Sequence, residues 1–332
     1  SSIGDGAQTF SFQRRSAELN RELDRLTAEL GSGQAANTRD AVRADFAKLT
    51  AVERGLRETE SYRSAASDAA LIASSQQNAL ELIASESEAL STTLLINSTD
   101  NANQMLSVDV GQSTDTLNLM LNALNTGVAG QHIFAGTATD QAPLVTAEAM
   151  LAELRPMINP AMTADEMITA IDSWFNDSGG GFETVAYKGN TATITAHIGD
   201  GEAVDLGTTA LSPGIRGALM GVAMTALIAE GSGPTDISAQ QDILQSAAET
   251  LRSGDAAITQ QRAKIGSVEG QIEATTTRHD TAINSLKQER TNILGIDAYE
   301  TSTQLDIVEA QLETLYILTN RLAKLTLTEF LR

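Results

Sequence analysis

Cysteine is absent from the 332 residues of this chain. That absence excludes structural disulfides, thiolate metal sites and cysteine nucleophiles. Aromatic residues are also scarce, at 4% of the chain, whereas hydrophobic residues in total reach 42%. The apolar content is therefore mostly Ala, Leu, Ile and Val, which favours long helices packed through small and aliphatic side chains over a deep aromatic-lined pocket.

Long apolar runs are missing as well. No run of about 18 apolar residues occurs, so the sequence predicts neither a membrane-spanning helix nor a membrane partner. The first residues lack a basic region followed by an apolar stretch, which is the pattern of a cleavable secretory signal. We therefore expect the protein either to stay in the cytoplasm or to leave the cell by a route that does not use such a signal.

Positive charge is in short supply. The chain holds 22 Lys and Arg against 43 Asp and Glu, which gives a formal charge of −21 and a pI near 4.4. Nucleic acids and anionic membranes are bound by clustered Lys and Arg, so this composition argues against both kinds of partner. The acidic residues are scattered at helix-surface spacing, where a solvated face that promotes solubility is the ordinary interpretation.

Proline and glycine, which interrupt helices, are confined to parts of the chain. All five prolines lie between positions 143 and 234, and no glycine occurs between Gly55 and Gly111. The first 142 residues and the last 98 can therefore form long, unbroken helices on steric grounds.

Apolar residues at both ends of the chain recur at coiled-coil spacing. Near the start they are Leu19, Leu23, Leu26 and Leu30. Near the end, with Thr319 at the one polar position, they are Leu305, Val308, Leu312, Leu315, Leu322 and Leu325. Such stripes bury themselves against another helix, and short helices barely form in water without that packing. We predict that the two ends pair with each other, and that these residues form an assembly interface.

The predicted fold is mainly α, with long N- and C-terminal helices in a coiled coil and helical bundle and a small inserted α+β lobe rich in β-hairpins. Residues 41–125 favour one long helix or two, and helical spacing returns over residues 236–296. Three domains are expected: a terminal coiled coil of residues 1–40 with 297–332, a helical rod of 41–136 with 213–296, and an outer lobe of 137–212.

The middle of the chain has a different pattern. Residues 182–187 alternate between apolar and polar, and the alternation resumes over residues 191–197. The turn at Gly199, Asp200 and Gly201 then precedes residues 203–206. Period-two alternation separated by glycine-bearing turns predicts β-hairpins, and residues 163–174 predict a short helix before them.

No constellation for catalysis is visible. The three histidines, His132, His197 and His279, lie in different regions without a His-x-x-x-His pair, which argues against a histidine metal site. No phosphate-binding glycine loop and no nucleophile elbow occurs. We predict no enzyme activity, no metal and no cofactor. The alternative is a secreted enzyme with a site in the lobe, near Trp174, Tyr187 and His197.

The chain ends resemble a known family. Residues 26–33 read Leu-Thr-Ala-Glu-Leu-Gly-Ser-Gly and are similar to the "L-S-T-G" segment after the first helix of the flagellin superfamily. Residues 325–332 resemble the short hydrophobic ending of the same proteins. The resemblance implies that the N- and C-terminal helices pair into the inner tube of an axial filament, and that the middle of the chain projects outward.

One motif narrows the resemblance to subunits of the hook–filament junction. Residues 127–136 read Gly-Val-Ala-Gly-Gln-His-Ile-Phe-Ala-Gly and precede Pro143, similar to the signature "G-x-Y-I-F-A-G … P". The residues matching that family motif are Gly130, Phe134, Ala135 and Gly136. Residues 187–190, Tyr-Lys-Gly-Asn, look like the "Y-x-G-D/N" segment that begins the outer lobe of those subunits.

The resemblance implies a structural subunit that leaves the cell through the flagellar export channel and forms a ring on which flagellin assembles. The implied partners are copies of itself, the other hook-associated junction protein, flagellin, the export apparatus and an export chaperone. The implied location is extracellular, in the flagellum. The alternative within the superfamily is flagellin itself, which shares the termini and the export route; the junction motif and the modest lobe disfavour it.

Overall fold

The computed structural model of the chain describes residues 2–37, 42, 46–97 and 112–330. The chain divides into two compact units. We call residues 1–60 with 280–332 the terminal unit, and residues 61–279 the middle unit. Long helices dominate and the strands are few and short, so the predicted mainly α fold with a small β part is confirmed.

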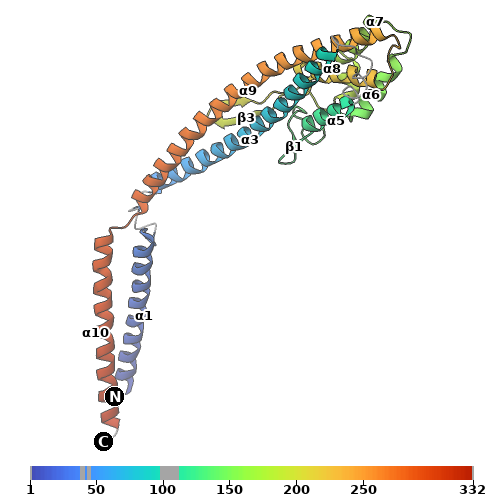
Figure 1. Cartoon of the computed structure of the whole chain (residues 1–332). Helices are drawn as coiled ribbons and strands as arrows, with labels where there is room; N and C mark the ends of the chain where they lie inside the picture. The colour runs from blue at the N-terminus through green and yellow to red at the C-terminus, as the bar shows by residue number, and fades with distance from the viewer. Residues whose placement is uncertain (1, 38–41, 43–45, 98–111, 331–332) are drawn as a thin grey trace. The chain divides into compact units, whose positions relative to one another are not determined.

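The terminal unit is built on two helices from opposite ends of the chain. Helix α1 (Ser2–Ser32) pairs with α10 (Ala298–Phe330) in an antiparallel arrangement, and both chain ends lie at the same end of the pair (Figure 1). The unit also holds the beginning of α3 (Phe46–Asn97) and the end of α9 (Ile237–Leu294). These two segments pack through a small cluster of Val52, Leu56 and Ile283, supported by Leu286 and Ile293.

The middle unit is organised around the rest of α3 and α9, together with α5 (Ser113–Leu124) and α8 (Pro213–Ala229). Helix α8 is apolar on all sides and almost entirely buried, as expected of a central helix. Small residues bring its backbone against α9: a side-chain carbon on Gly254 would lie only 2.9 Å from the backbone nitrogen of Ala218. Glycine at this position is therefore required by the close approach of the two helices.

The inserted segment adds short elements to this bundle. They are α6 (Ala147–Leu154), a 3₁₀ turn at Arg155–Met157, and α7 (Ala164–Asn176). Thr163 caps α7: its hydroxyl accepts from the Glu166 N–H, and the Glu166 carboxylate accepts from the Thr163 N–H. The predicted helix over residues 163–174 thus begins as expected and continues slightly further.

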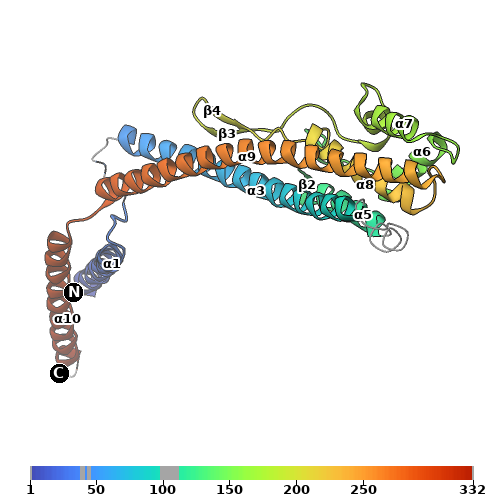
Figure 2. The same ribbon diagram turned by 45° about the horizontal axis from the view of Figure 1, so that its top comes forward.

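Two short antiparallel hairpins supply the β structure. Strands β1 (Gly127–Val128) and β2 (Gln131–His132) pair across the start of the family motif. Strands β3 (Thr195–Gly199) and β4 (Glu202–Asp205) form the predicted later hairpin, with an irregularity between His197 and Gly199. This hairpin lies beside α9 (Figure 2), where the Glu202 carboxylate accepts hydrogen bonds from Arg278 and Thr275.

The strand expected at residues 182–187 is wrong. Phe182–Ala186 form a short π-helical turn instead, in which the Tyr187 N–H donates to the Phe182 carbonyl at 2.8 Å. Phe182 and Ala186 are both buried, and a spacing of four residues fits a helical turn as well as an alternating strand. Gly181 lies directly against the Trp174 ring, so a side chain could not be accommodated at this position.

One continuous core fills the middle unit. It joins Leu80 and Ile83 of α3, Leu251 of α9, Phe134 of the family motif, and Phe175 of α7. Trp174, Phe175 and Phe182 contact one another with ring centroids 4.8–6.2 Å apart, so three of the few aromatic side chains gather in one place. Residues 137–212 therefore share their core with the helical rod, and the three-domain division with its boundaries stays a prediction.

Candidate assembly surface

The apolar stripes at the two chain ends meet between α1 and α10. Leu19 and Leu26 are buried against Val308 and Leu312. Leu23, Leu305 and Leu315 are partly buried around this cluster. We call these seven residues the seam. The predicted pairing of the two ends is thereby confirmed, while the role of the seam in assembly stays a prediction.

Three predicted seam positions lie outside this cluster. Leu30 is half-buried near the end of α1 and is not part of the cluster. Leu322 and Leu325 lie in the last stretch of α10, where the structure describes the backbone but no side chains, so these two positions fall outside the described part.

A buried carboxylate fixes the end of α1. Glu29 is only 5% exposed, and Arg25 donates to both of its carboxylate oxygens at 2.8 Å. The Ala36 N–H donates to the same carboxylate at 2.9 Å, which holds the following connector against the helix. Arg25 also pairs with Glu22, and that hydrogen bond keeps the pKa of Glu22 below its ordinary value. Buried charge is thus accommodated by pairing.

The segment that follows α1 pairs with the segment between α9 and α10. The Ala35 N–H donates to the Leu294 carbonyl at 2.9 Å, and the Ile296 N–H donates to the Gly33 carbonyl at 3.3 Å. These bonds flank an antiparallel bridge between Gln34 and Gly295. The register of the seam is therefore set by backbone hydrogen bonds as well as by apolar packing.

Helix α10 also carries exposed apolar side chains on the two sides of the seam. Ile307, Tyr316, Ile317 and Leu318 are 43–57% exposed. We call these four residues the outer face. A groove of about 430 Å³ runs over Ile307, Thr314 and Leu318 and continues to Leu19 on α1. A second groove, of about 410 Å³, is lined by Tyr316 and Ile317 among others. Both grooves are shallow and apolar, which suits another protein surface better than a small molecule.

The family motif packs tightly against residues 187–190. Phe134 and Ala135 are fully buried, and Gly130 and Gly136 have positive φ angles of 80° and 67°. A side-chain carbon on Gly136 would lie 2.4 Å from the Asn190 carbonyl oxygen, so only glycine fits there. In return, the Asn190 N–H donates to the Ala135 carbonyl at 3.0 Å. The two segments that carried the family resemblance are therefore in direct contact.

Side-chain hydrogen bonds also stabilise the contact between these two segments. The Tyr187 hydroxyl donates to the Asn190 carbonyl at 2.8 Å, and burial raises the pKa of Tyr187 to about 12. The Thr137 N–H donates to the Asn190 side-chain oxygen at 2.9 Å. These hydrogen bonds hold the start of the inserted segment against residues 187–190, so the role of the two segments here is structural.

Gln76 of α3 connects the long helix to the family motif and to the segment after β4. Its side chain is fully buried, and its Nε2 donates to the carbonyls of Ile133 at 3.1 Å and Leu206 at 3.2 Å. These carbonyls follow β1–β2 and β4, so one side chain serves two loops that are far apart in sequence. Exchanging the amide oxygen and nitrogen would place oxygen against oxygen, which fixes the orientation of this amide.

The residues of the enzyme alternative do not converge. Trp174 and Tyr187 are buried in the core, whereas His197 is exposed on β3. In the part of the chain that the structure describes, no three His, Asp or Glu side chains gather closely enough to hold a metal ion. Among the same described residues, none of the helices combines the length and apolar character needed to cross a membrane.

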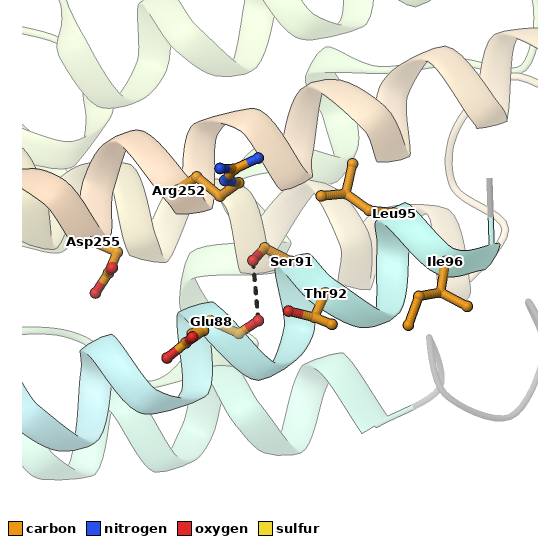
Figure 3. Close-up of a pocket in the computed structure, with 7 residues that line it drawn as sticks. All are labelled: Glu88, Ser91, Thr92, Leu95, Ile96, Arg252 and Asp255. Carbon is orange, nitrogen blue, oxygen red and sulfur yellow. Dashed lines mark hydrogen bonds between the residues drawn. The ribbon is translucent and has the colours of Figure 1, made fainter. Parts of the chain in front are cut away.

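An open cleft of about 640 Å³ lies between α3 and α9 in the middle unit (Figure 3). Glu88, Ser91 and Ile96 line it from α3, and Arg252 and Asp255 from α9. Its single marked hydrogen bond runs from the Ser91 hydroxyl to the Glu88 backbone carbonyl at 3.0 Å. The polar groups do not point at a common centre, so the cleft has no arrangement for catalysis.

The sequence analysis did not identify the outer face or Gln76. Tyr316, Ile317 and Leu318 are consecutive in sequence, so the heptad rule that located the seam gives no signal for them. Gln76 occupies a position between the buried Ala73 and Leu80, and a polar residue within an apolar stripe is a signal of a buried hydrogen-bonding role.

The C-terminal helices match a known family model. Residues 254–331 match the family model of the bacterial flagellin C-terminal helical region. This region takes in most of α9 and all of α10, including the C-terminal part of the seam. The resemblance to the flagellin superfamily is therefore confirmed.

Two solved structures have a similar fold. A flagellar hook-associated protein from Vibrio parahaemolyticus is similar at a TM-score of 0.55 and 15% identity, over 74% of this chain and 95% of that chain. FlgL from Bacillus cereus is similar at a TM-score of 0.52 and 13% identity, over 72% of this chain and 98% of that chain. At these identities the likeness is one of fold. No curated protein sequence matches the chain.

Proposed function

We propose that this chain is a structural subunit of the bacterial flagellum that forms a ring at the hook–filament junction, on which flagellin assembles. The observation that carries the proposal is the terminal unit, in which the seam joins the chain ends while the outer face of α10 stays uncovered. The flagellin C-terminal match and the fold of the two hook-associated structures support it.

The outer face supports self-assembly on physical grounds. A two-helix pair can bury only one stripe of each helix, so the exposed apolar side chains of α10 need another surface. Burying a Leu or Ile side chain contributes about 1.5–3 kcal/mol before the cost of ordering, so Ile307, Ile317 and Leu318 together supply a substantial driving force. The occupant we propose for this face is the terminal unit of a neighbouring copy in the ring.

The remaining partners follow from the same proposal. We infer contacts with the other hook-associated junction protein on one side of the ring and with flagellin on the other. The route to this extracellular location is the flagellar export channel, with a chaperone guarding the apolar C-terminal helix before export. The function is geometric, so we infer no enzymatic activity.

The decisive experiment is electron microscopy of cells that lack the gene, with flagellin assayed in the medium. Hooks without filaments, together with flagellin free in the medium, are the expected result. Normal filaments in the deletion strain would refute the junction role.

Complementation then tests the outer face. Leu318→Asp, which places a charge in the apolar groove, should restore neither filaments nor flagellin retention. Ser302→Asp is the matched control, because Ser302 is exposed near the start of α10 and belongs to neither the seam nor the outer face. Full rescue by Leu318→Asp would show that the outer face does not take part in assembly.

Flagellin remains the second candidate, because the matched family model describes the flagellin C-terminal region itself. The deletion strain separates the two candidates. Loss or thinning of filaments without flagellin released into the medium would indicate a filament subunit.

A further inference from the structure

Charge is divided unevenly between the two units. The terminal unit holds 14 Lys and Arg against 18 Asp and Glu, a formal charge of −4. The middle unit holds 8 Lys and Arg against 25 Asp and Glu, a formal charge of −17. Most of the chain's excess negative charge therefore lies outside the unit that carries the seam and the outer face.

Four of the eight cations of the middle unit are ion-paired with acids of the same unit. Arg155 pairs with Glu148 and Glu230, and Arg216 pairs with Glu183. Two further pairs, each from α9, are Arg262 with Glu81 and Arg278 with Glu202. These pairs neutralise acids of the same unit, so the remaining acids set the sign of its outer surface.

The two units are parts of one continuous chain. The boundary between them falls inside α3 (Phe46–Asn97) and inside α9 (Ile237–Leu294), so two continuous helices connect the units. A complex of two copies joined through their terminal units therefore also contains two acidic middle units. Repulsion between like charges reaches far at low salt, where the Debye length is about 30 Å at 0.01 M, and is largely screened at high salt.

We propose that the charge of the middle unit opposes self-association through the terminal unit, so that ionic strength regulates assembly of this chain. The inference rests on the proposed function, because it concerns the same assembly surface. The apolar outer face supplies the attraction, and the −17 charge of the middle unit sets a threshold of salt below which copies stay apart.

The test is sedimentation velocity of the full chain at fixed concentration in about 20 mM and about 0.5 M NaCl, which span long and short Debye lengths. The apparent association constant should rise at least about tenfold at the higher salt. A variant with four exposed acids neutralised, none of them ion-paired with another described residue, should associate more at low salt and depend less on salt. Its changes are Asp68→Asn, Glu153→Gln, Asp242→Asn and Glu273→Gln.

The matched control keeps the charge at the same positions, with Asp68→Glu, Glu153→Asp, Asp242→Glu and Glu273→Asp. It should follow the unmodified chain, since a general effect of salt on apolar contacts acts on all variants alike. Association that ignores salt, or that is equal in the neutralised and control variants, overturns this inference alone. Absence of association at every salt concentration overturns it together with the proposed assembly surface.

Discussion

The terminal and middle units bury apolar surface in different ways. The middle unit has one continuous core, in which α8 is surrounded and the rings of Phe134, Phe175 and Phe182 are fully buried. The terminal unit has two small clusters, the seam and the group around Val52, and the outer face of α10 stays exposed. The comparison teaches that most apolar side chains of the middle unit are covered within the unit, whereas the terminal unit leaves apolar surface uncovered, which is the surface that the proposed assembly would bury.

The largest expected effect contrasts two phenylalanines. Phe134→Ala removes a fully buried ring of the family motif and should lower the free energy of unfolding by about 3–5 kcal/mol, through lost burial and a cavity. Phe10→Ala on α1, where the ring is 66% exposed, should change it by less than about 0.5 kcal/mol. Urea unfolding followed by circular dichroism measures both, and equal effects would refute the contrast between the units.

A seam residue tests the independence of the terminal unit. Leu26→Ala should destabilise α1 and α10 by about 2–3 kcal/mol, because Leu26 is the most buried seam residue. Hydrogen exchange should then speed up in both helices and stay unchanged in α8. The exposed neighbour Thr27→Ala is the control. Faster exchange in α8 as well would show that the two units unfold together.

Gln76 tests how the middle unit holds its inserted segment. Gln76→Leu keeps the side-chain size but leaves the carbonyls of Ile133 and Leu206 without this donor, which should cost about 1–3 kcal/mol. Asn78→Leu, at an exposed position on the same helix, should be close to neutral. Thermal unfolding compares the two, and a neutral Gln76→Leu would mean that water replaces the amide.

The smallest effect is a pH dependence of the β3–β4 hairpin. Hydrogen bonds from Arg278, and then from Thr275, lower the pKa of Glu202 from its ordinary value of 4.5. A lowered pKa in the folded state means that this contact stabilises the hairpin above the ordinary pKa and is lost as pH falls through the lowered one. Arg278→Gln should shift the pKa of Glu202 upward, as measured by carboxyl-carbon NMR. An unchanged pKa in this variant would contradict the assigned cause.

The sequence by itself determined the helical parts of this protein. Long helices followed from the absence of proline outside residues 143–234 and of glycine between Gly55 and Gly111. The residues of the seam followed from heptad spacing, because local periodicity fixes which face of a helix is apolar. The limits of α9 were also close, since helical spacing and turn residues coincide at both of its ends. The family resemblance rested on residues 127–136 and 187–190, whose mutual contact the sequence did not reveal.

Only the tertiary structure decided the rest. The π-helical turn at Phe182–Ala186 replaced a predicted strand, because packing of Gly181 on Trp174 outweighs an alternation that fits both conformations. The partners of Gln76 lie more than fifty residues away in sequence, so no local pattern could identify them. The outer face likewise became visible only when α1 covered the seam, since burial is a property of neighbours and not of spacing.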